Sequence, residues 1–187
     1  MFNKFFIFLF ILVNSPLTIQ ANEKQLIINQ LININNIIFD FEQTSNNKRE
    51  TGTCVLSFNN KLSCDYKDSM QKRILVNNKT LIVQHRRYDK IYFYPISKSP
   101  LIKIFNKDNL IDLIKKSDYQ LNDDIELTYI NKNNEKIIIF FKKDNYYLVG
   151  WRVIDQLKNI INFSIKIKDI NSEIDPKIFK IPSSIRG

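Results

Sequence analysis

The sequence is poor in the residues that build most catalytic and metal sites, with three glycines, two cysteines and one histidine among 187 residues. Any Ser-His-Asp or Cys-His mechanism would depend on His85, which lies in the basic stretch QHRRYDK and is more simply an exposed polar residue. The motifs G-x-S-x-G and H-E-x-x-H are absent, as is a glycine-rich phosphate loop. Ser69 and Lys72 match S-x-x-K, but the companion motifs are missing. We therefore expect no enzymatic activity, no metal site and no cofactor.

Long hydrophobic runs are also missing. The apolar run Phe5–Val13 is too short to cross a bilayer as a helix, which takes roughly 20 residues. Lys4 precedes the run and the small residue Ala21 follows it, which is the layout of a secretory signal peptide. We predict a signal peptide at residues 1–21 and a single domain at residues 22–187; a retained membrane anchor is the alternative. No cysteine follows the predicted cleavage site, so we do not expect the chain to be a bacterial lipoprotein of the usual kind.

Acidic residues are fewer than basic ones, 19 against 28, which gives a formal net charge of +9. The lysines are spread through turns and strands, with no arginine cluster, zinc spacing or basic helix. Nucleic acid is therefore not an expected partner. A basic surface that faces acidic partners or anionic lipid head groups remains open.

The hydrophobic periodicity predicts two helices and about ten strands. From Glu23, apolar residues at Leu26, Ile27, Leu31 and Ile34 follow helical spacing. A second short helix is predicted after Pro100, with an apolar face of Leu110, Ile111, Leu113 and Ile114 and with Asp108 near its start. The period changes to two at Ile37, and nine further short strands follow, at 53–58, 61–66, 73–76, 80–85, 90–94, 125–130, 136–141, 146–154 and 160–167. Asn-Asn and Asp-Asn turns separate several of them. This pattern predicts an α+β, mainly β, antiparallel meander that closes into a sandwich, barrel or half-barrel.

Both cysteines lie in the stretch TGTCVLSFNNKLSCDY, on either side of one predicted turn. A hairpin with a three-residue loop at 58–60 sets Leu56 opposite Leu62 and Cys54 opposite Cys64. Directly opposed Cβ atoms in such a ladder are close to disulfide range. Because a signal peptide implies an oxidising compartment, we predict a structural Cys54–Cys64 disulfide; two buried free thiols are the alternative.

Several predicted strands are apolar on both faces, among them 81–83, 91–94 and 137–141. A sheet with one face in water alternates apolar and polar residues, so both faces here need cover. Helices on one side and a curled sheet would enclose a hydrophobic cavity. An ordinary two-layer core is the alternative.

Five stretches together resemble the LolA family of periplasmic outer-membrane lipoprotein carrier proteins. They are LININNIIFDFEQT (31–44), GTCVLSFNNKLSCDY (52–66), LIVQHRRYDKIYFYPISKSPL (81–101), GWRVID (150–155) and EIDPKIFKIP (173–182). Their order and spacing hold across nearly the whole predicted mature chain. The resemblance implies an unclosed antiparallel β-barrel, or half-barrel, with short helices as a lid over a hydrophobic cavity.

The resemblance also implies a function in the periplasm of a Gram-negative bacterium. Such a carrier takes lipoproteins from an ATP-driven inner-membrane complex and delivers them to the outer membrane, often through a receptor of similar fold. We expect a monomer. Its lid would be the two predicted helices, with Leu26, Ile27, Leu31, Ile34, Leu110, Ile111, Leu113 and Ile114. The candidate acyl-binding wall comprises Phe39, Phe41, Leu56, Tyr92, Tyr94, Phe140 and Trp151. A general lipid-binding module and an envelope-sensing protein of the same fold are the alternatives.

Two positions depart from the pattern of the family. Members of the family carry Arg-Pro before the first hairpin turn, where the arginine helps to hold the lid, and Phe58-Asn59 stand here. Relatives also place glycine in a turn after the Trp strand, where this chain has Lys158. We expect Asn159 to take the left-handed conformation in that turn.

Overall fold

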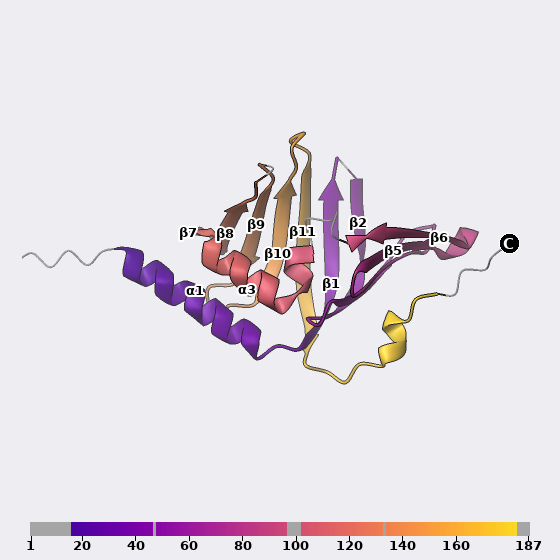
Figure 1. Cartoon of the computed structure of the whole chain (residues 1–187), viewed down its shortest axis with the longest axis horizontal. Helices are drawn as coiled ribbons and strands as arrows, with labels where there is room; N and C mark the ends of the chain where they lie inside the picture. The colour runs from indigo at the N-terminus through magenta and orange to yellow at the C-terminus, as the bar shows by residue number, and fades with distance from the viewer. Residues whose placement is uncertain (1–15, 47, 97–101, 133, 183–187) are drawn as a thin grey trace, which may run out of the picture.

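The computed structural model describes residues 16–46, 48–96, 102–132 and 134–182. They form one antiparallel sheet with helices packed on one of its faces (Figure 1). The strands are β1 Asn36–Ser45, β2 Lys48–Ser57, β3 Lys61–Tyr66, β4 Lys72–Asn77, β5 Thr80–His85, β6 Lys90–Pro95, β7 Asp118–Leu121, β8 Ile125–Ile130, β9 Lys136–Phe141, β10 Leu148–Ile154 and β11 Ile160–Ile170. The helices are α1 Pro16–Ile32, α2 Ile102–Phe105 and α3 Lys107–Lys116, with two 3₁₀ turns, η1 Arg86–Tyr88 and η3 Pro176–Phe179.

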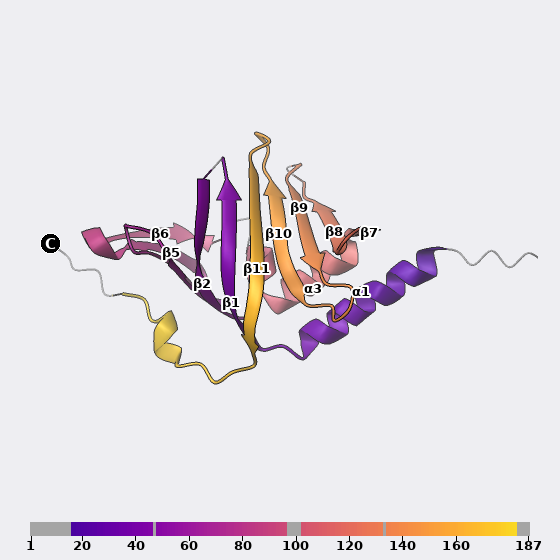
Figure 2. The same cartoon turned by 180° about the vertical axis from the view of Figure 1, so that it is seen from behind.

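The sheet is open. Its eleven strands follow the order β6-β5-β4-β3-β2-β1-β11-β10-β9-β8-β7, so β6 and β7 are its two edges. All neighbours are antiparallel, and β1 and β11 join the two halves of the sheet. Strands β5 and β6 run at a steep angle to β9–β11 in both views, which gives the sheet its strong curvature (Figure 2). The prediction of a mainly β, unclosed half-barrel with a helical cover is confirmed.

The curvature gives the sheet an inner face, which carries Phe39, Cys54, Cys64 and Trp151 and is covered by the helices. Alternation along β1 explains this face: Ile37, Phe39 and Phe41 are buried, while the residues between them are half-buried on the other side. On the outer face, η3 covers β3 and β4, and Arg73 donates from Nη2 to the Ile178 carbonyl at 2.7 Å. Both faces of this part of the sheet are therefore covered.

Asparagine supplies most of the tight turns. Asn60, Asn78 and Asn134 adopt left-handed backbone at the β2–β3, β4–β5 and β8–β9 turns, which is a conformation that Asn tolerates. In the β10–β11 turn the expectation was wrong, because Lys158 itself has φ of 64°. Asn159 instead donates from its side chain to Asp155 Oδ2 at 2.8 Å.

Helix α1 is longer than the sequence predicted, since it begins at Pro16. Ile27, Ile28 and Leu31 are buried, and α1 packs against α3. The N-cap of α3 is Asn106, whose side chain accepts from Asn109 N at 2.9 Å. Residues 1–15, with the apolar run of the predicted signal peptide, and Pro100 lie outside the described residues. Within the described part, no helix has the length and apolar character to cross a membrane.

Candidate functional site

The inner face holds an apolar cavity of about 250 Å³, close to the β1–β11 junction. Phe105 of α2 closes it on the helix side. The residues around it are Phe39, Gln43, Cys54, Leu62, Cys64, Tyr66, Lys72, Ile74, Leu81, Phe105, Trp151 and Phe163. Most of these side chains are hydrocarbon or aromatic, which is the usual lining of a site for an apolar ligand.

A row of aromatic rings runs beside the cavity, and all of them except Phe41 line it. Trp151 stacks on Phe163 with ring centroids 4.3 Å apart, and Phe163 stacks on Phe41 at 4.9 Å. Phe41 meets the edge of Tyr66 at 4.8 Å, and Phe105 meets Trp151 edge-on at 6.3 Å. Offset and edge-on rings at these spacings attract one another beyond simple area burial. The row therefore holds this side of the cavity firm.

Trp151 is only 2% exposed, yet its indole N–H finds no hydrogen-bond acceptor among the described residues. A buried polar group without a partner costs roughly 1 to 3 kcal/mol. A ligand carbonyl that reached this N–H would remove that cost.

Polar residues gather at one end of the cavity. Lys72 Nζ lies 2.6 Å from Glu50 Oε1 and 3.7 Å from the centroid of the Tyr66 ring. The Tyr66 hydroxyl donates to Gln43 Oε1 at 3.2 Å. The Lys72 and Glu50 side chains are only 16% and 12% exposed. The mainly apolar cavity thus ends in the shielded Lys72–Glu50 ion pair and the hydrogen-bonded hydroxyl of Tyr66.

These surroundings shift two pKa values. Burial alone would raise the pKa of Glu50, but the hydrogen bonds and positive charges of Lys72 and Lys48 outweigh burial and lower it. The pKa of Tyr66 is raised well above its usual value, mainly by burial and also by the nearby carboxylates of Glu50 and Asp68. Glu50 is therefore ionised and Tyr66 neutral at physiological pH.

The two cysteines form a disulfide that lines the cavity. The register of β2 and β3 places Cys54 opposite Cys64 and Leu56 opposite Leu62, as the hairpin argument predicted. The disulfide thus ties two neighbouring strands together beneath the pocket.

The structure distributes the predicted wall residues over four places. Phe39 and Trp151 line the cavity, whereas Phe41 and Leu56 are buried on the same face without lining it. Register places Tyr92 opposite Val83 and Tyr94 opposite Leu81, so both tyrosines continue the inner face at the exposed edge of the sheet. His85, which we expected to be exposed, is half-buried with its ring 6.0 Å from that of Tyr92.

Phe140 lies elsewhere. Trp151 pairs with Ile139, so the next residue along β9 points to the opposite face. Arg152 covers the Phe140 ring there, with Cζ 5.7 Å from the ring centroid. Phe140 is therefore an outer-face residue and takes no part in the cavity wall.

Sequence reasoning missed Leu62, Ile74, Leu81, Phe105 and Phe163 as cavity residues. The strand alternation carried a signal for three of them. Once Cys64 is placed on the inner face, successive hairpin pairing sets Leu62, Ile74 and Leu81 on that face too. Phe105 and Phe163 depend on long-range packing, for which the sequence carries no comparable signal.

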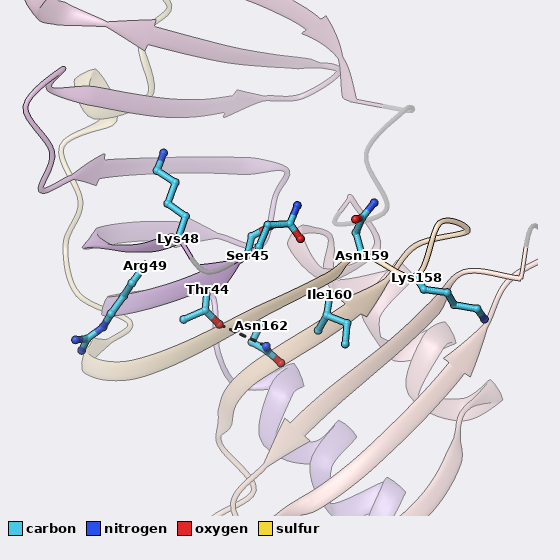
Figure 3. Close-up of a pocket in the computed structure, with 9 residues that line it drawn as sticks. Thr44, Ser45, Lys48, Arg49, Lys158, Asn159, Ile160 and Asn162 are labelled. Carbon is cyan, nitrogen blue, oxygen red and sulfur yellow. Dashed lines mark hydrogen bonds between the residues drawn. The ribbon is translucent and has the colours of Figure 1, made fainter.

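A larger hollow of about 550 Å³ lies at the β1–β2 and β10–β11 turns (Figure 3). Its lining is polar, and the long side chains of Lys48, Arg49 and Lys158 spread apart rather than converge. Arg49 already pairs with Glu42 at 2.5 Å, and Lys48 with Glu50 at 2.9 Å. An open hollow whose cations are paired or divergent is a poor ligand site, so the smaller apolar cavity is the better candidate.

The sequence profile of the family described as "Outer membrane lipoprotein carrier protein LolA" matches residues 33–182. The chain belongs to the LolA family. The match covers every strand of the sheet, and helix α1 lies before it. The family is named for a carrier of lipoproteins, and its members belong to the cell envelope. No curated protein sequence matches the chain.

Solved structures share the LolA-like fold at low sequence identity. An uncharacterised conserved protein from Thermus thermophilus has a TM-score of 0.54 at 6% identity, covering 87% of this chain and 94% of its own. The lipoprotein LppX from Mycobacterium tuberculosis has a TM-score of 0.52 at 12% identity, covering 86% and 99%. MucB has a TM-score of 0.52 at 10% identity, covering 88% and 64%. At these identities the similarity establishes the fold alone.

Most residues of the predicted lid helices belong to the hydrophobic core, although α1 ends at Ile32, so Ile34 lies after the helix. Ile27, Leu31, Ile34, Leu110, Leu113 and Ile114 are buried in the core, while Leu26 and Ile111 are half-buried. Helix α3 contacts β8, and Figure 1 shows it in front of the β8–β10 part of the sheet. The helices therefore cover one half of the trough, and Phe105 covers the cavity beside it.

The β2–β3 turn, where the resemblance led us to expect an arginine, contacts the helices through other residues. Asn59 forms an isolated β-bridge with Asn106, whose Nδ2 donates to Asn60 Oδ1 at 3.1 Å. Phe58 is buried, and Lys107 Nζ lies 5.9 Å from the centroid of its ring. Lys107 also donates to the Ile32 carbonyl at 3.0 Å. One short turn thus contacts the start of α3, while Lys107 joins α3 to the end of α1.

Proposed function

We propose that this LolA-family protein is a periplasmic carrier that binds the acyl chains of lipoproteins released from the inner membrane and delivers them to the outer membrane. The observation that carries the proposal is the covered apolar cavity with a polar end, set in a sheet of this family. The apolar part of the cavity would hold the hydrocarbon of the ligand, and the polar end would receive its more polar part.

The volume of the cavity determines how much hydrocarbon fits without a movement of the helices. A methylene group fills about the volume of a water molecule, roughly 30 Å³, so a cavity of about 250 Å³ holds about eight. Burial of about 0.8 kcal/mol per methylene then contributes about 6 kcal/mol, from which the cost of association is subtracted. A longer chain, or a second one, requires α2 and Phe105 to move away from Trp151.

That movement keeps binding reversible. Full burial of several acyl chains would exceed the practical limit of non-covalent affinity, about 20 kcal/mol. Loss of the contacts that Phe105 and α3 make in the free protein offsets part of the gain. Transfer between membranes then follows from the different affinities of donor, carrier and acceptor, with no chemical step in the carrier.

The indole N–H of Trp151 favours an acyl ester or amide over a plain hydrocarbon. Its missing acceptor would be a carbonyl of the lipid-modified N-terminus of a lipoprotein. The partners are thus outer-membrane-directed lipoproteins, the ATP-driven inner-membrane complex that releases them, and an outer-membrane receptor of similar fold where one exists.

Ligand identity and a cavity-filling variant test the proposal together. Native mass spectrometry of the protein from the periplasm should find bound lipoprotein. Ile74→Phe should fill the cavity and weaken binding of a fluorescent fatty acid about tenfold or more, whereas Ile167→Phe on β11, outside the lining, should bind normally.

Three results would oppose the proposal. Bound acyl lipids without lipoproteins would indicate a general lipid-binding module. A polar ligand, or equal fatty-acid affinity in both variants, would reject the cavity as the site.

A further inference from the structure

The β5–β6 edge, residues 80–95, exposes aromatic side chains at one end of the open sheet. On β6, Tyr92, Phe93 and Tyr94 are 43%, 50% and 47% exposed, and Tyr88 in η1 is 57% exposed. Proteins usually protect an edge strand with charge, bulges or cover. Tyr92 and Tyr94 lie on the inner face of β6 and Phe93 on the other face, so exposed aromatic side chains flank this edge on both sides. Clusters of exposed apolar side chains mark interaction surfaces.

The same region is strongly basic. Residues 72–96 contain six lysines and arginines and one acidic residue, which amounts to +5 of the net charge of +9. Lys72 is paired with Glu50, while Arg73 and Arg86 share Asp65. Lys79, Arg87 and Lys90 have no carboxylate partner among the described residues and remain to meet an external anion.

The turn next to η1 adds to the surface. Arg87 N donates to the Met70 carbonyl at 3.3 Å, and its Nη1 donates to the Ser69 carbonyl at 3.3 Å. These bonds join the exposed Met70 to Arg87, the residue before the exposed Tyr88. Arg87, Tyr88 and Lys90 thus lie at one end of the β5–β6 edge and Lys79 at the other, with the aromatic residues of β6 between them.

We propose that the β5–β6 edge docks on the surface of an anionic lipid membrane. Tyrosine rings concentrate at the level of lipid head groups, and each lysine or arginine near an anionic bilayer adds to the attraction. Lys79, Arg87 and Lys90 contact phosphates while the aromatic residues enter the head-group layer.

Other occupants fit the edge less well. A second copy of the chain would bring the same positive charge to the contact, and like charges across an interface are unfavourable. An added protein strand would pair with the backbone of β6, where Pro95 has no N–H to donate. Neither occupant would use the free cations.

Docking would also join the membrane to the cavity. Tyr92 and Tyr94 oppose Val83 and Leu81, which oppose Ile74 and Val76. Leu81 and Ile74 line the cavity. An acyl chain that leaves a bilayer at β6 therefore follows one continuous apolar face. This route rests on the proposed carrier function, whereas the docking itself does not.

Co-sedimentation with vesicles tests the docking. The purified protein is mixed with vesicles of phosphatidylcholine alone or of phosphatidylcholine with phosphatidylglycerol, whose anionic head groups give the surface a negative potential. We expect binding to the anionic vesicles that falls as salt rises. Arg87→Glu with Lys90→Glu should weaken it by roughly 30-fold or more.

Tyr92→Ser with Tyr94→Ser should also weaken vesicle binding. The matched controls are Lys143→Glu with Lys166→Glu for charge and Leu157→Ser with Ile130→Ser for exposed apolar area, all away from the edge. Both controls should bind vesicles as the unmodified protein does. Circular dichroism and fatty-acid binding in solution check that each variant is folded.

The outcomes separate the two proposals. Equal vesicle binding by edge variants and controls, or equal binding to neutral and anionic vesicles, overturns the docking. Self-association that the edge variants abolish, without vesicle binding, would assign the edge to a second copy. Weak vesicle binding with intact fatty-acid binding in the edge variants, and the reverse in Ile74→Phe, supports docking as distinct from the cavity.

Discussion

Asn106 Nδ2 donates to Asn60 Oδ1 at 3.1 Å, which ties the start of α3 to the turn between β2 and β3. The same Asn106 side chain caps α3 by accepting from Asn109 N. One amide group thus both begins the helix and fastens it to the sheet. If α3 is part of a lid, this contact resists its opening.

Asn60→Gly should loosen α3 without disturbing the turn. Asn60 has a left-handed backbone with φ of 66°, which glycine adopts without strain. Loss of one hydrogen bond should lower the protection of α3 amides by about 1 kcal/mol, seen as several-fold faster hydrogen exchange. Asn78→Gly, at another left-handed turn residue with φ of 55°, is the control. Equal exchange in the two variants would mean that the contact does not hold the helix.

Replacing both cysteines with alanine should destabilise the protein without unfolding it. Nine residues separate Cys54 from Cys64, and closing such a loop contributes about 2 to 3 kcal/mol in the chain-entropy model. We expect Tm to fall by about 5 to 10 °C in thermal unfolding. Reduction of the unmodified protein should reproduce most of this fall. A variant as stable as the oxidised parent would contradict the structural role.

Gly52→Ala should destabilise the protein more than the addition of a single methyl group suggests. An added Cβ would lie 2.2 Å from the Asp65 carbonyl oxygen and 2.6 Å from Cε1 of Phe41. The backbone oxygen cannot move freely, so β2 and β3 would separate, at a cost of about 1 to 3 kcal/mol. Thr51→Ala on the same strand is the control. Urea unfolding measures both, and near-equal midpoints would show that the strands accommodate the methyl group.

Glu50→Gln should make the free energy of unfolding less dependent on pH in the acidic range. The lowered pKa of Glu50 in the folded protein means that its contribution is complete above its usual value of 4.5 and is lost as pH falls through the lowered value. At pH 7 the variant leaves Lys72 shielded without a carboxylate, at a cost of about 1 to 3 kcal/mol. The difference from the parent should shrink on acidification below about pH 4.

The exposed pair Asp112–Lys116 supplies the control for this experiment. Asp112→Asn should leave the stability at pH 7 almost unchanged, because both side chains are exposed. Denaturant midpoints between pH 3 and pH 7 give both comparisons. A gap between Glu50→Gln and the parent that is constant over this range would reject the assigned role of Glu50.

Local patterns in the sequence predicted the strands and the cysteine hairpin well. The bounds of β3, β5, β8 and β9 agree with those read from alternation and turn residues. Period-two patterning also set the register of β2 against β3, because a slip of one residue would turn Cys54 and Leu56 to the other face. The sequence did not predict α2 and β7. Each has only four residues, which is too few for a hydrophobic period to emerge.

The cavity was harder to predict than the sheet. In the run IIIFF both faces are apolar, so alternation could not tell Phe140 from Phe141, and only pairing with β10 decides. The aromatic row needs β11 to lie beside β1 and β10, which is a long-range arrangement. In the β10–β11 turn, Asp155 holds Asn159 by hydrogen bonds, so the left-handed position falls to Lys158.

The pairing of β1 with β11 has a consequence for how the chain acquires its structure. These two strands come from opposite ends of the sequence, and they join the two halves of the sheet. Contacts so distant in sequence form slowly, and a growing chain presents its N-terminal part first. One edge of β1 therefore has no strand partner until the last strand has been synthesised. An unpaired strand edge of this kind is prone to aggregation, so truncation before β11 should yield an aggregation-prone chain.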